Sequence, residues 1–148
     1  ASEPHLTELT QTPTLGLRKK VPLDQLQTAY GALLGPVKTY AVKAGLNPVH
    51  TYCRWYDSSD PKVVDMEMGV TLEKPAPSGD GIEAGELPAG RAVTLTHTGP
   101  YTGVWPAYQK LHSWAILNRR KSAPQAWALY LIENPAEPVT EVTLPLVD

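Results

Sequence analysis

Apolar residues along the chain follow two kinds of spacing in different stretches. In some stretches apolar and polar residues alternate one by one, which predicts strands because successive side chains of a strand point to opposite faces of a sheet. In two other stretches apolar residues recur every three or four positions, which predicts amphipathic helices. The expected strands are residues 7–22, 49–56, 63–72, 82–97, 125–132 and 139–147, the fourth interrupted by a Pro-Ala-Gly segment.

The two helical stripes cover residues 26–44 and 104–115. Gly45 directly follows the first stripe, at the position where a helix often ends in a left-handed residue. Gly35-Pro36 interrupts that stripe, so we expect a kink or a short break there. Thr102 precedes the second stripe and is expected to cap its N-terminus.

The order strand, helix, strand, strand occurs twice, with the copies about 75 residues apart. The halves extend over about residues 5–73 and 82–148, and a Pro- and Gly-rich connection at 74–85 joins them. The chain has 148 residues, a length typical of one domain or of two halves packed as one. We therefore expect a single α+β domain, residues 1–148, built from a duplicated strand–helix–strand–strand module.

The alternation of apolar and polar residues also predicts which side chains lie on each face of the sheet. In the first half Cys53 and Trp55 are expected to lie under the helix, with Met66, Met68 and Val70 also facing inward. The opposite, open face is then both aromatic and polar. Its expected members are Tyr52, Arg54, Tyr56, Asp65 and Glu67.

In the second half we place Trp127, Leu129 and Leu131 under the helix. Ala128 and Tyr130 then point to the open face. In the strand before the helix, Val93 and Leu95 are expected to face inward, leaving Ala92, Thr94 and Thr96 open. Open faces of this composition, joined into one concave surface, would suit a ligand pocket.

Composition narrows the function classes. The net charge is −2 at pH 7, which argues against broad nucleic-acid binding. The apolar runs are too short to cross a membrane. A single cysteine, Cys53, forbids an internal disulfide and favours a reducing compartment, so we expect a cytoplasmic protein. The four histidines lack metal-ligand spacing, and we expect neither a metal nor a cofactor.

Several short motifs occur in an order that resembles the GyrI-like small-molecule-binding family. They are Leu87-Pro88-Ala89-Gly90, His97-Thr98-Gly99-Pro100-Tyr101, Trp105…Tyr108…Leu111…Trp114, Leu129-Tyr130-Leu131…Asn134-Pro135 and Thr140-Glu141-Val142-Thr143-Leu144-Pro145. The first half adds Gly45-Leu46-Asn47-Pro48 before Tyr52, and Asp65-Met66-Glu67-Met68-Gly69. The resemblance covers nearly the whole chain.

The resemblance implies an eight-stranded antiparallel sheet with two main helices and a central cleft. It also implies binding of flat, often cationic, aromatic compounds, as in the effector-binding domains of multidrug-sensing transcription activators. No DNA-reading motif accompanies the module here, so we expect a stand-alone member. Similar proteins in the family hydrolyse cyclopropane-bearing genotoxins, and others bind proteins such as DNA gyrase.

The sequence departs from the family at one position of consequence. The family usually has a glutamate two residues before the tyrosine matched by Tyr130, and here that position is Ala128. The resemblance assigns that acid to cationic ligands and, in hydrolytic members, to proton abstraction. With Ala128, a methyl group leaves extra room and one negative charge fewer on the expected ligand face.

Glu67 is then the strongest acid for the site, and Glu141 is a weaker candidate. Glu67 would meet a cationic ligand or activate water; alternatively it is a solvated strand carboxylate or a partner of nearby Arg54. Five aromatic residues are candidates for a clamp that stacks on planar ligands, and packing in the core or rim is the alternative. They are Tyr30, Tyr56, Tyr101, Trp105 and Tyr130.

Three functions follow. The first is binding of aromatic, in part cationic, drug-like molecules at Tyr30, Arg54, Tyr56, Glu67, Tyr101, Trp105, Ala128 and Tyr130. The second is hydrolysis of strained electrophiles, with Glu67 as base and the Tyr130 hydroxyl stabilising the developing oxyanion. The third is a protein-interaction module.

Overall fold

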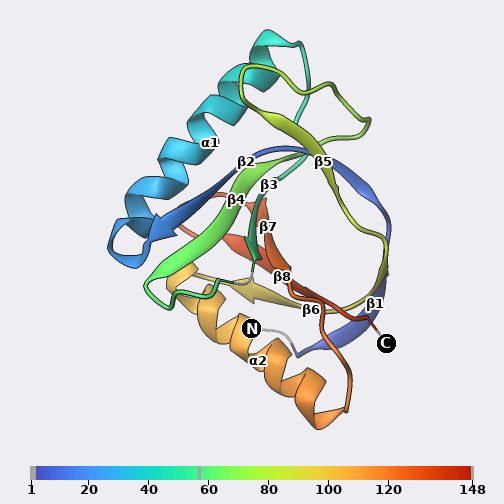
Figure 1. Cartoon of the computed structure of the whole chain (residues 1–148). Coiled ribbons are helices and arrows are strands. Elements are labelled where there is room, and N and C mark those ends of the chain that lie inside the picture. Colours follow the sequence, from blue (N-terminus) through green and yellow to red (C-terminus); the bar gives the residue numbers. More distant parts are fainter. Residues whose placement is uncertain (1–2, 57, 148) are drawn as a thin grey trace. The chain divides into compact units, whose positions relative to one another are not determined.

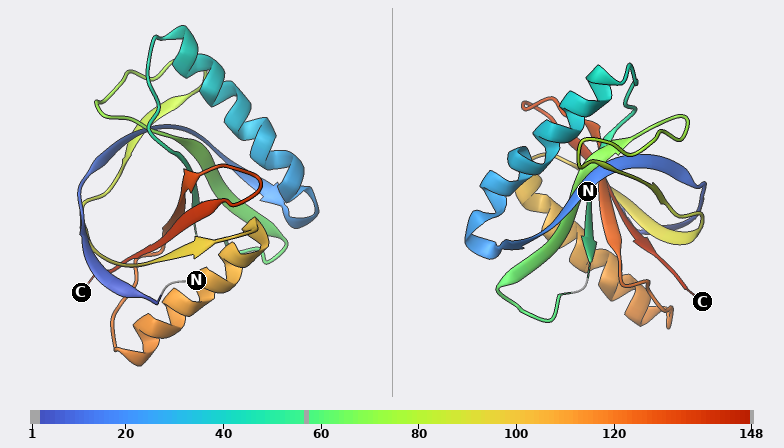
Figure 2. Two further views of the ribbon diagram at one scale, coloured as in Figure 1. Left: turned by 180° about the vertical axis from the view of Figure 1, so that it is seen from behind. Right: turned by 45° about the horizontal axis from the view of Figure 1, so that its top comes forward.

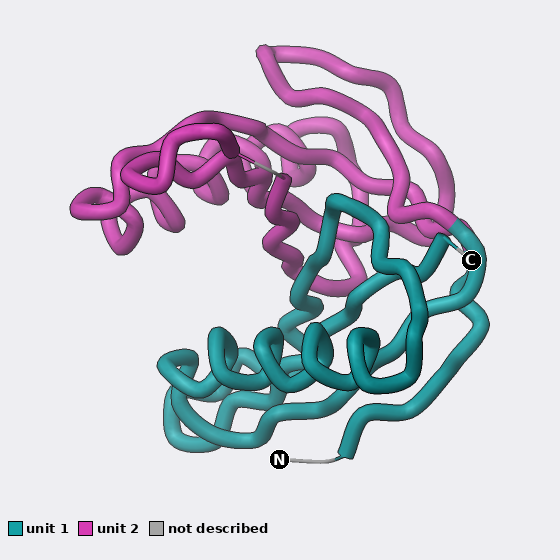
Figure 3. Tube along the Cα trace, turned by 60° about the horizontal axis from the view of Figure 1, so that its bottom comes forward, with its two compact units in different colours: residues 1–10, 89–148 teal, residues 11–88 magenta. Residues whose placement is uncertain are grey.

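The computed structural model describes residues 3–56 and 58–147. The chain divides into two compact units, shown in different colours in Figure 3. Unit 1 comprises residues 1–10 and 89–148, and unit 2 comprises residues 11–88. Each unit contains four strands and one long helix, labelled in Figure 1.

Unit 2 is built on four antiparallel strands in the order β3-β4-β2-β5. A single turn of 3₁₀ helix, Leu23–Gln25, connects β2 to the long helix α1. The elements are β2 (Thr12–Pro22), α1 (Leu26–Lys43), β3 (Thr51–Tyr56), β4 (Val63–Thr71) and β5 (Glu83–Leu87).

Unit 1 repeats this plan, with antiparallel strands in the order β1-β6-β8-β7. A 3₁₀ turn, Tyr101–Gly103, precedes its long helix α2. The elements are β1 (His5–Leu9), β6 (Gly90–Thr98), α2 (Val104–Leu117), β7 (Ala126–Ile132) and β8 (Val139–Pro145). The views in Figure 2 let the reader follow α1 along the strands of unit 2 and α2 along those of unit 1.

The eight-stranded antiparallel sheet and the two main helices confirm the α+β class expected from the sequence. The module strand, helix, strand, strand occurs as β2-α1-β3-β4 and again as β6-α2-β7-β8. Residues 7–22 were expected as one strand, and this is wrong. Residues 82–97 were expected as a strand interrupted at Pro88-Ala89-Gly90, and the break between β5 and β6 falls there. Each of the two segments contains two strands, and the leading one pairs in the other copy of the module: β1 pairs with β6, and β5 pairs with β2.

Helix α1 runs without a break through Pro36, so the expected short break is wrong. A proline cannot donate to the carbonyl four residues earlier, which belongs to Ala32. Ala32 lies on the exposed side of the helix, where water can take that hydrogen bond. The end of the helix is as expected: Gly45 has φ +72°, and Leu46 N donates to Ala41 O at 2.9 Å.

Helix α2 begins differently from the expectation. Thr102 lies inside the 3₁₀ turn, the capping position is Gly103, and no side chain caps it. The ring of His97 lies against Gly103, and its Nε2 is 2.8 Å from Pro100 O. A side chain at position 103 would collide with that ring, so glycine holds the position where threonine was expected.

The core of unit 2 confirms the expected faces of its sheet. Val37 of α1 packs with Leu15 of β2 and Val70 of β4, and all three are fully or almost fully buried. Leu15 and Val70 are register partners, as are Cys53 and Met68 one row along on the same face. Helix α1 therefore covers the face that carries Cys53, and the other face of the sheet is left for polar residues.

In unit 1 the register contradicts part of the expected face assignment. Val142 pairs with both Leu95 and Ala128, so these three side chains lie on one face, although Leu95 and Ala128 were expected on opposite faces. Tyr130 shares that face and contacts Tyr101, which lies just before α2. The start of α2 is thus over the face of Ala128 and Tyr130, and the expectation that the helix covers the opposite face is wrong.

Candidate functional site

The candidate site is the face of the unit 2 sheet that α1 leaves uncovered. Strands β2, β4 and β3 contribute to it in three rows of register partners. Small residues and a tyrosine form the first row, and charged residues dominate the other two. The rows are Gly16–Gly69–Tyr52, Arg18–Glu67–Arg54 and Lys20–Asp65–Tyr56.

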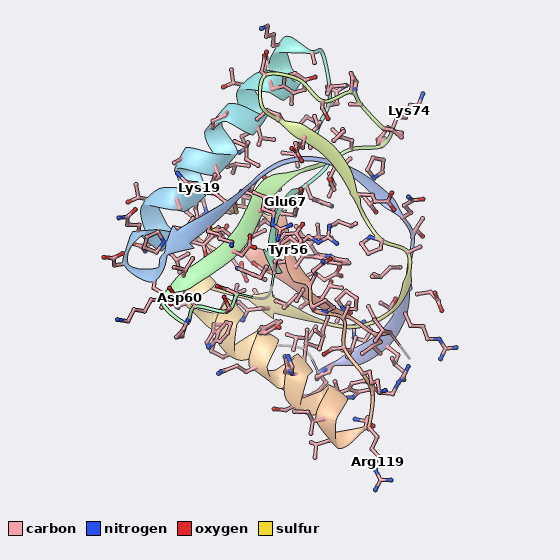
Figure 4. The ribbon with its side chains drawn as sticks, viewed as in Figure 1. Lys19, Tyr56, Asp60, Glu67, Lys74 and Arg119 are labelled. Carbon is pink, nitrogen blue, oxygen red and sulfur yellow. The ribbon has the colours of Figure 1, made fainter. Side chains whose placement is uncertain are left out.

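The centre of the site is the carboxylate of Glu67, which is half-buried. The Tyr56 hydroxyl donates to Glu67 Oε1 at 2.5 Å, and the Tyr52 hydroxyl donates to Glu67 Oε2. Figure 4 labels Glu67 on β4 and Tyr56 on the neighbouring strand β3. Each oxygen of the carboxylate therefore accepts a phenol, which fixes its orientation and spreads its charge.

A pair of glycines makes room for the first of these phenols. Gly16 and Gly69 are register partners, and the fully buried Tyr52 lies across them. A methyl group on Gly69 would lie 2.8 Å from the Tyr52 ring, and one on Gly16 would lie 2.5 Å from its hydroxyl oxygen. Glycine at both positions is what allows the tyrosine to reach Glu67.

A second contact places a planar cation on the Tyr56 ring. The Arg18 guanidinium lies 3.6 Å from the ring centroid, a close cation–π distance. Asp65 holds the guanidinium in a two-bond pair, with Nε and Nη2 donating at 2.9 and 2.8 Å. The Arg54 guanidinium lies 5.4 Å from the same centroid, and its Nη1 donates to Glu86 O at 3.0 Å.

The electrostatics of these groups follow from their partners. Burial, and then the hydrogen bond to Glu67, raise the pKa of Tyr56 to about 12. The same causes, burial first, raise the pKa of Tyr52 further. The hydrogen bonds from Arg18 hold the pKa of Asp65 below its usual value. Both tyrosines are therefore neutral donors at physiological pH, while Asp65 stays charged.

Two cavities adjoin this cluster. One of about 180 Å³ lies between Glu67, Tyr56 and the edge strand β5, with Arg54 and Glu83–Glu86 also in its wall. The other, about 490 Å³, is lined by Lys19, Lys20, Asp65, Gly81 and Glu83 among others. Arg18 lines both cavities, as do Gly16 and Glu83.

The remaining expected site residues lie in other places. Tyr30 of α1 is on the helix-covered side of the unit 2 sheet near Cys53, and burial raises its pKa to about 12. In unit 1, Tyr101 meets Tyr130 edge to face at 5.4 Å, and Trp105, 64% exposed, stacks on Tyr108 at 5.4 Å.

Ala128 is fully buried, so its methyl group has no open space around it. Glu141 of β8 pairs with Leu129 of β7, on the face opposite to Ala128. The structure therefore brings together three of the expected residues, Arg54, Tyr56 and Glu67. One concave surface shared by both halves stays a prediction.

Sequence reasoning placed Tyr52 and Asp65 on the open face, by their parity with Tyr56 and Glu67, but did not name them as ligand-binding residues. Arg18 was left out altogether. Arg18 carries no local signal, because its contact with Asp65 joins positions 47 residues apart and depends on the register of β2 with β4.

Tyr56 is expected to stay protonated up to about pH 12. An unfolded tyrosine ionises near pH 10, so a folded pKa above that value stabilises the fold below pH 10 and ceases to do so as the pH rises through about 12. Ultraviolet difference titration of the parent and Tyr56→Phe measures this. The variant should lose one late ionisation, and loss of an ionisation near pH 10 instead would contradict the burial and the hydrogen bond.

The family model of the GyrI-like small molecule binding domain matches residues 2–147. The chain therefore belongs to the GyrI-like family and is a small-molecule-binding domain of that class. No curated protein matches the sequence at a significant level.

Solved structures support the fold. The EcmrR C-terminal domain is 22% identical with a TM-score of 0.82, and the match covers 99% of this chain and 98% of that domain. EcmrR in a complex with DNA is 23% identical with a TM-score of 0.81, covering 97% of this chain, which spans 57% of that longer protein. SAV2435 bound to tetraphenylphosphonium is 12% identical with a TM-score of 0.71, covering 99% and 94%.

Two features are not found in the part of the chain that the structure describes. No helix there is long and apolar enough to span a membrane. Among the same residues, no group of three or more histidine, cysteine or acidic side chains is placed to hold a metal ion.

Proposed function

We propose that this domain binds aromatic cations, and that the cluster around Glu67 and Tyr56 recognises the positive charge. One observation carries the proposal: the Tyr56 ring already holds a planar cation, Arg18, at 3.6 Å beside the Glu67 carboxylate. A ring face next to a partly desolvated carboxylate is the arrangement that attracts a flat, delocalised cation.

The hydrogen bonds of Glu67 favour binding over catalysis. Both carboxylate oxygens accept tyrosine hydroxyls, whose high pKa keeps them protonated. A carboxylate engaged in this way is a fixed negative charge rather than an open acceptor for a proton from water. The adjacent cavity of about 180 Å³ has room for part of a ligand, with one aromatic arm inside and the rest outside.

The comparisons support the class of ligand. The family is one of small-molecule binding, and SAV2435, which has a similar fold, is described with tetraphenylphosphonium, an aromatic cation. That compound is therefore a suitable first probe. Stacking and desolvation in a half-open pocket suggest a dissociation constant of roughly micromolar scale.

Replacing Glu67 by glutamine is expected to weaken binding of tetraphenylphosphonium by about five- to thirty-fold, since it removes the charge and keeps the shape. Isothermal titration calorimetry of the parent and Glu67→Gln measures the change. Tetraphenylborate, an anion of the same shape, should bind the parent far more weakly than the phosphonium.

Glu73→Gln is the matched control, because it removes one negative charge from an exposed position that follows the same strand. It should leave the affinity within about two-fold. Equal losses of affinity in Glu67→Gln and Glu73→Gln would show that the effect comes from net charge alone and would contradict the proposed site. Absence of binding by the parent across tetraphenylphosphonium and a planar cationic dye would contradict the proposed function itself.

A further inference from the structure

The inference concerns Arg18, a residue of β2 whose side chain is only half covered. Its side chain is 52% exposed, whereas that of its partner Asp65 is 7% exposed. The guanidinium nevertheless occupies the face of Tyr56 at 3.6 Å, beside the carboxylate that accepts the Tyr56 hydroxyl. The ring position that an aromatic cation would need is thus filled by a cation of the chain itself.

We propose that Arg18 is a built-in competitor for the cation position formed by Tyr56, Glu67 and Asp65, and that its side chain must leave before an external aromatic cation can bind. The proposal rests on the proposed function and specifies how that site selects its ligands. Only a cation that stacks and desolvates better than a guanidinium would displace Arg18.

The surroundings allow such a displacement. Arg18 has a long side chain on the face of the sheet that α1 leaves uncovered, and it lines both cavities, of about 180 and 490 Å³. Rotation of the side chain from the smaller cavity toward the larger one needs no movement of the β2 backbone. Side-chain rotations of exposed residues are fast, so the exchange would not limit the rate of binding.

The carboxylates of Asp65 and Glu67 would keep counter-charges after the Arg18 side chain leaves. Lys20 is the register partner of Asp65 on the same face, and its field already lowers the pKa of that carboxyl. An entering cation would also lie close to Asp65 and Glu67. The departure of Arg18 therefore leaves a carboxylate pair with Lys20 and the ligand as counter-charges, which limits the cost of breaking the Arg18–Asp65 pair.

The experiment compares binding of tetraphenylphosphonium by the parent, Arg18→Gln and Lys38→Gln, measured by calorimetry at one ionic strength. Arg18→Gln should raise the affinity about five- to thirty-fold, the range expected when a resident cation–π contact no longer competes. Lys38→Gln removes the same charge from an exposed position of α1, the helix that covers the other face of the sheet, and should change the affinity less than two-fold.

Two further variants test the cause. Arg18→Lys keeps the charge but loses the planar stack and the two-bond pair, so it should give a smaller gain than Arg18→Gln. Tyr56→Leu added to Arg18→Gln should abolish the gain, because the uncovered ring is the source of it. Thermal melts of each variant confirm that it is folded before titration.

The outcomes are distinct. A gain in affinity in Arg18→Gln that depends on Tyr56 supports the inference. If the parent binds with Glu67 dependence but Arg18→Gln binds equally or less well, the inference is wrong and the proposed function stands. If neither protein binds the phosphonium, both are wrong. A gain of equal size in Lys38→Gln would show a general charge effect and overturn the role of Arg18.

Discussion

Gly69→Ala should destabilise the protein by about 3 kcal/mol or more, an effect typical of an overpacked buried site. A methyl group at this position would collide with the Leu15 carbonyl oxygen, and would lie 2.8 Å from both the Gly16 Cα and the Tyr52 ring. Two of these three neighbours are backbone atoms of the adjacent strand β2, which cannot move aside without loss of the ladder between β2 and β4. Urea unfolding of the parent and the variant measures the difference.

Gly31→Ala supplies the control for this prediction. Gly31 lies on the exposed side of α1, and a methyl group there would meet nothing within 4 Å. Alanine is the better helix former, so this variant should be stabilised by up to about 1 kcal/mol. A Gly69→Ala protein as stable as its parent would contradict the close packing of Tyr52 against the two glycines.

The destabilisation should extend to the site. Tyr52 reaches Glu67 only because positions 16 and 69 carry no side chain. Gly16→Ala is the milder change, since the atoms nearest to its methyl group would belong to the side chains of Tyr52 and Glu67 and not to the backbone of a neighbouring strand. It should therefore disturb binding of a cation more than it disturbs the free energy of unfolding.

The sequence predicted the faces of unit 2 well because its strands alternate cleanly. In β3 the order Tyr-Cys-Arg-Trp-Tyr places large polar side chains on one parity and Cys53 and Trp55 on the other. In β4 the acids and methionines alternate in the same way. Such a pattern fixes the register of a strand relative to the core, and so Arg54, Tyr56 and Glu67 could be expected to meet.

The same reasoning failed in unit 1 because β7 carries no such contrast. Its residues Ala126–Ile132 are all apolar or aromatic, so the alternation does not show which parity faces the helix, and the parity of Trp127, Leu129 and Leu131 was wrongly placed on the helix side. Pairing with β8 and β6 decides the face, and those pairings are long-range. The two faces of a continuously apolar strand can be assigned only from the strands that pair with it.

The split of residues 7–22 into β1 and β2 is a failure of another kind. Three polar residues, Thr10 to Thr12, interrupt the alternation between the two strands, but such a short run does not show that the strands pair in different units. For the equivalent split between β5 and β6, the sequence carried a signal in Pro88 and Gly90. In the structure Gly90 has φ +130°. Which partner each strand takes is a property of the whole topology.

Ala128→Glu is expected to lower the free energy of unfolding by about 2–5 kcal/mol at neutral pH, since it buries a carboxylate. Ala128 is fully buried and shares its face with Leu95 and Val142, whose side chains cannot accept or donate a hydrogen bond. The resemblance to the family places a glutamate at this position, whereas in this chain the Ala128 methyl group lies in an apolar contact.

The pH dependence separates charge from size. Burial raises the pKa of a carboxyl group above its unfolded value of about 4.3, so the folded variant binds its proton more tightly than the unfolded chain. The penalty is then smallest below pH 4 and grows as the pH rises toward the folded pKa. Ala128→Gln has nearly the same volume without a charge, and its loss of stability relative to the parent should not change with pH. A pH-independent loss in Ala128→Glu would contradict burial of the carboxylate.

A cation can decide whether position 128 belongs to a ligand site, as the resemblance implies. If a bound cation lies beside the new carboxylate, tetraphenylphosphonium should stabilise Ala128→Glu more than it stabilises Ala128→Gln, by the logarithmic dependence of stability on ligand concentration. Such a cation would give an affinity gain of about five- to thirty-fold over the parent. Because Ala128 is fully buried on the face that the start of α2 covers, we expect no such gain for either tetraphenylphosphonium or tetraphenylborate. Equal stabilisation of both variants by the phosphonium would place its charge away from Ala128, and would leave the cluster of Glu67 and Tyr56 as the cation site of this chain.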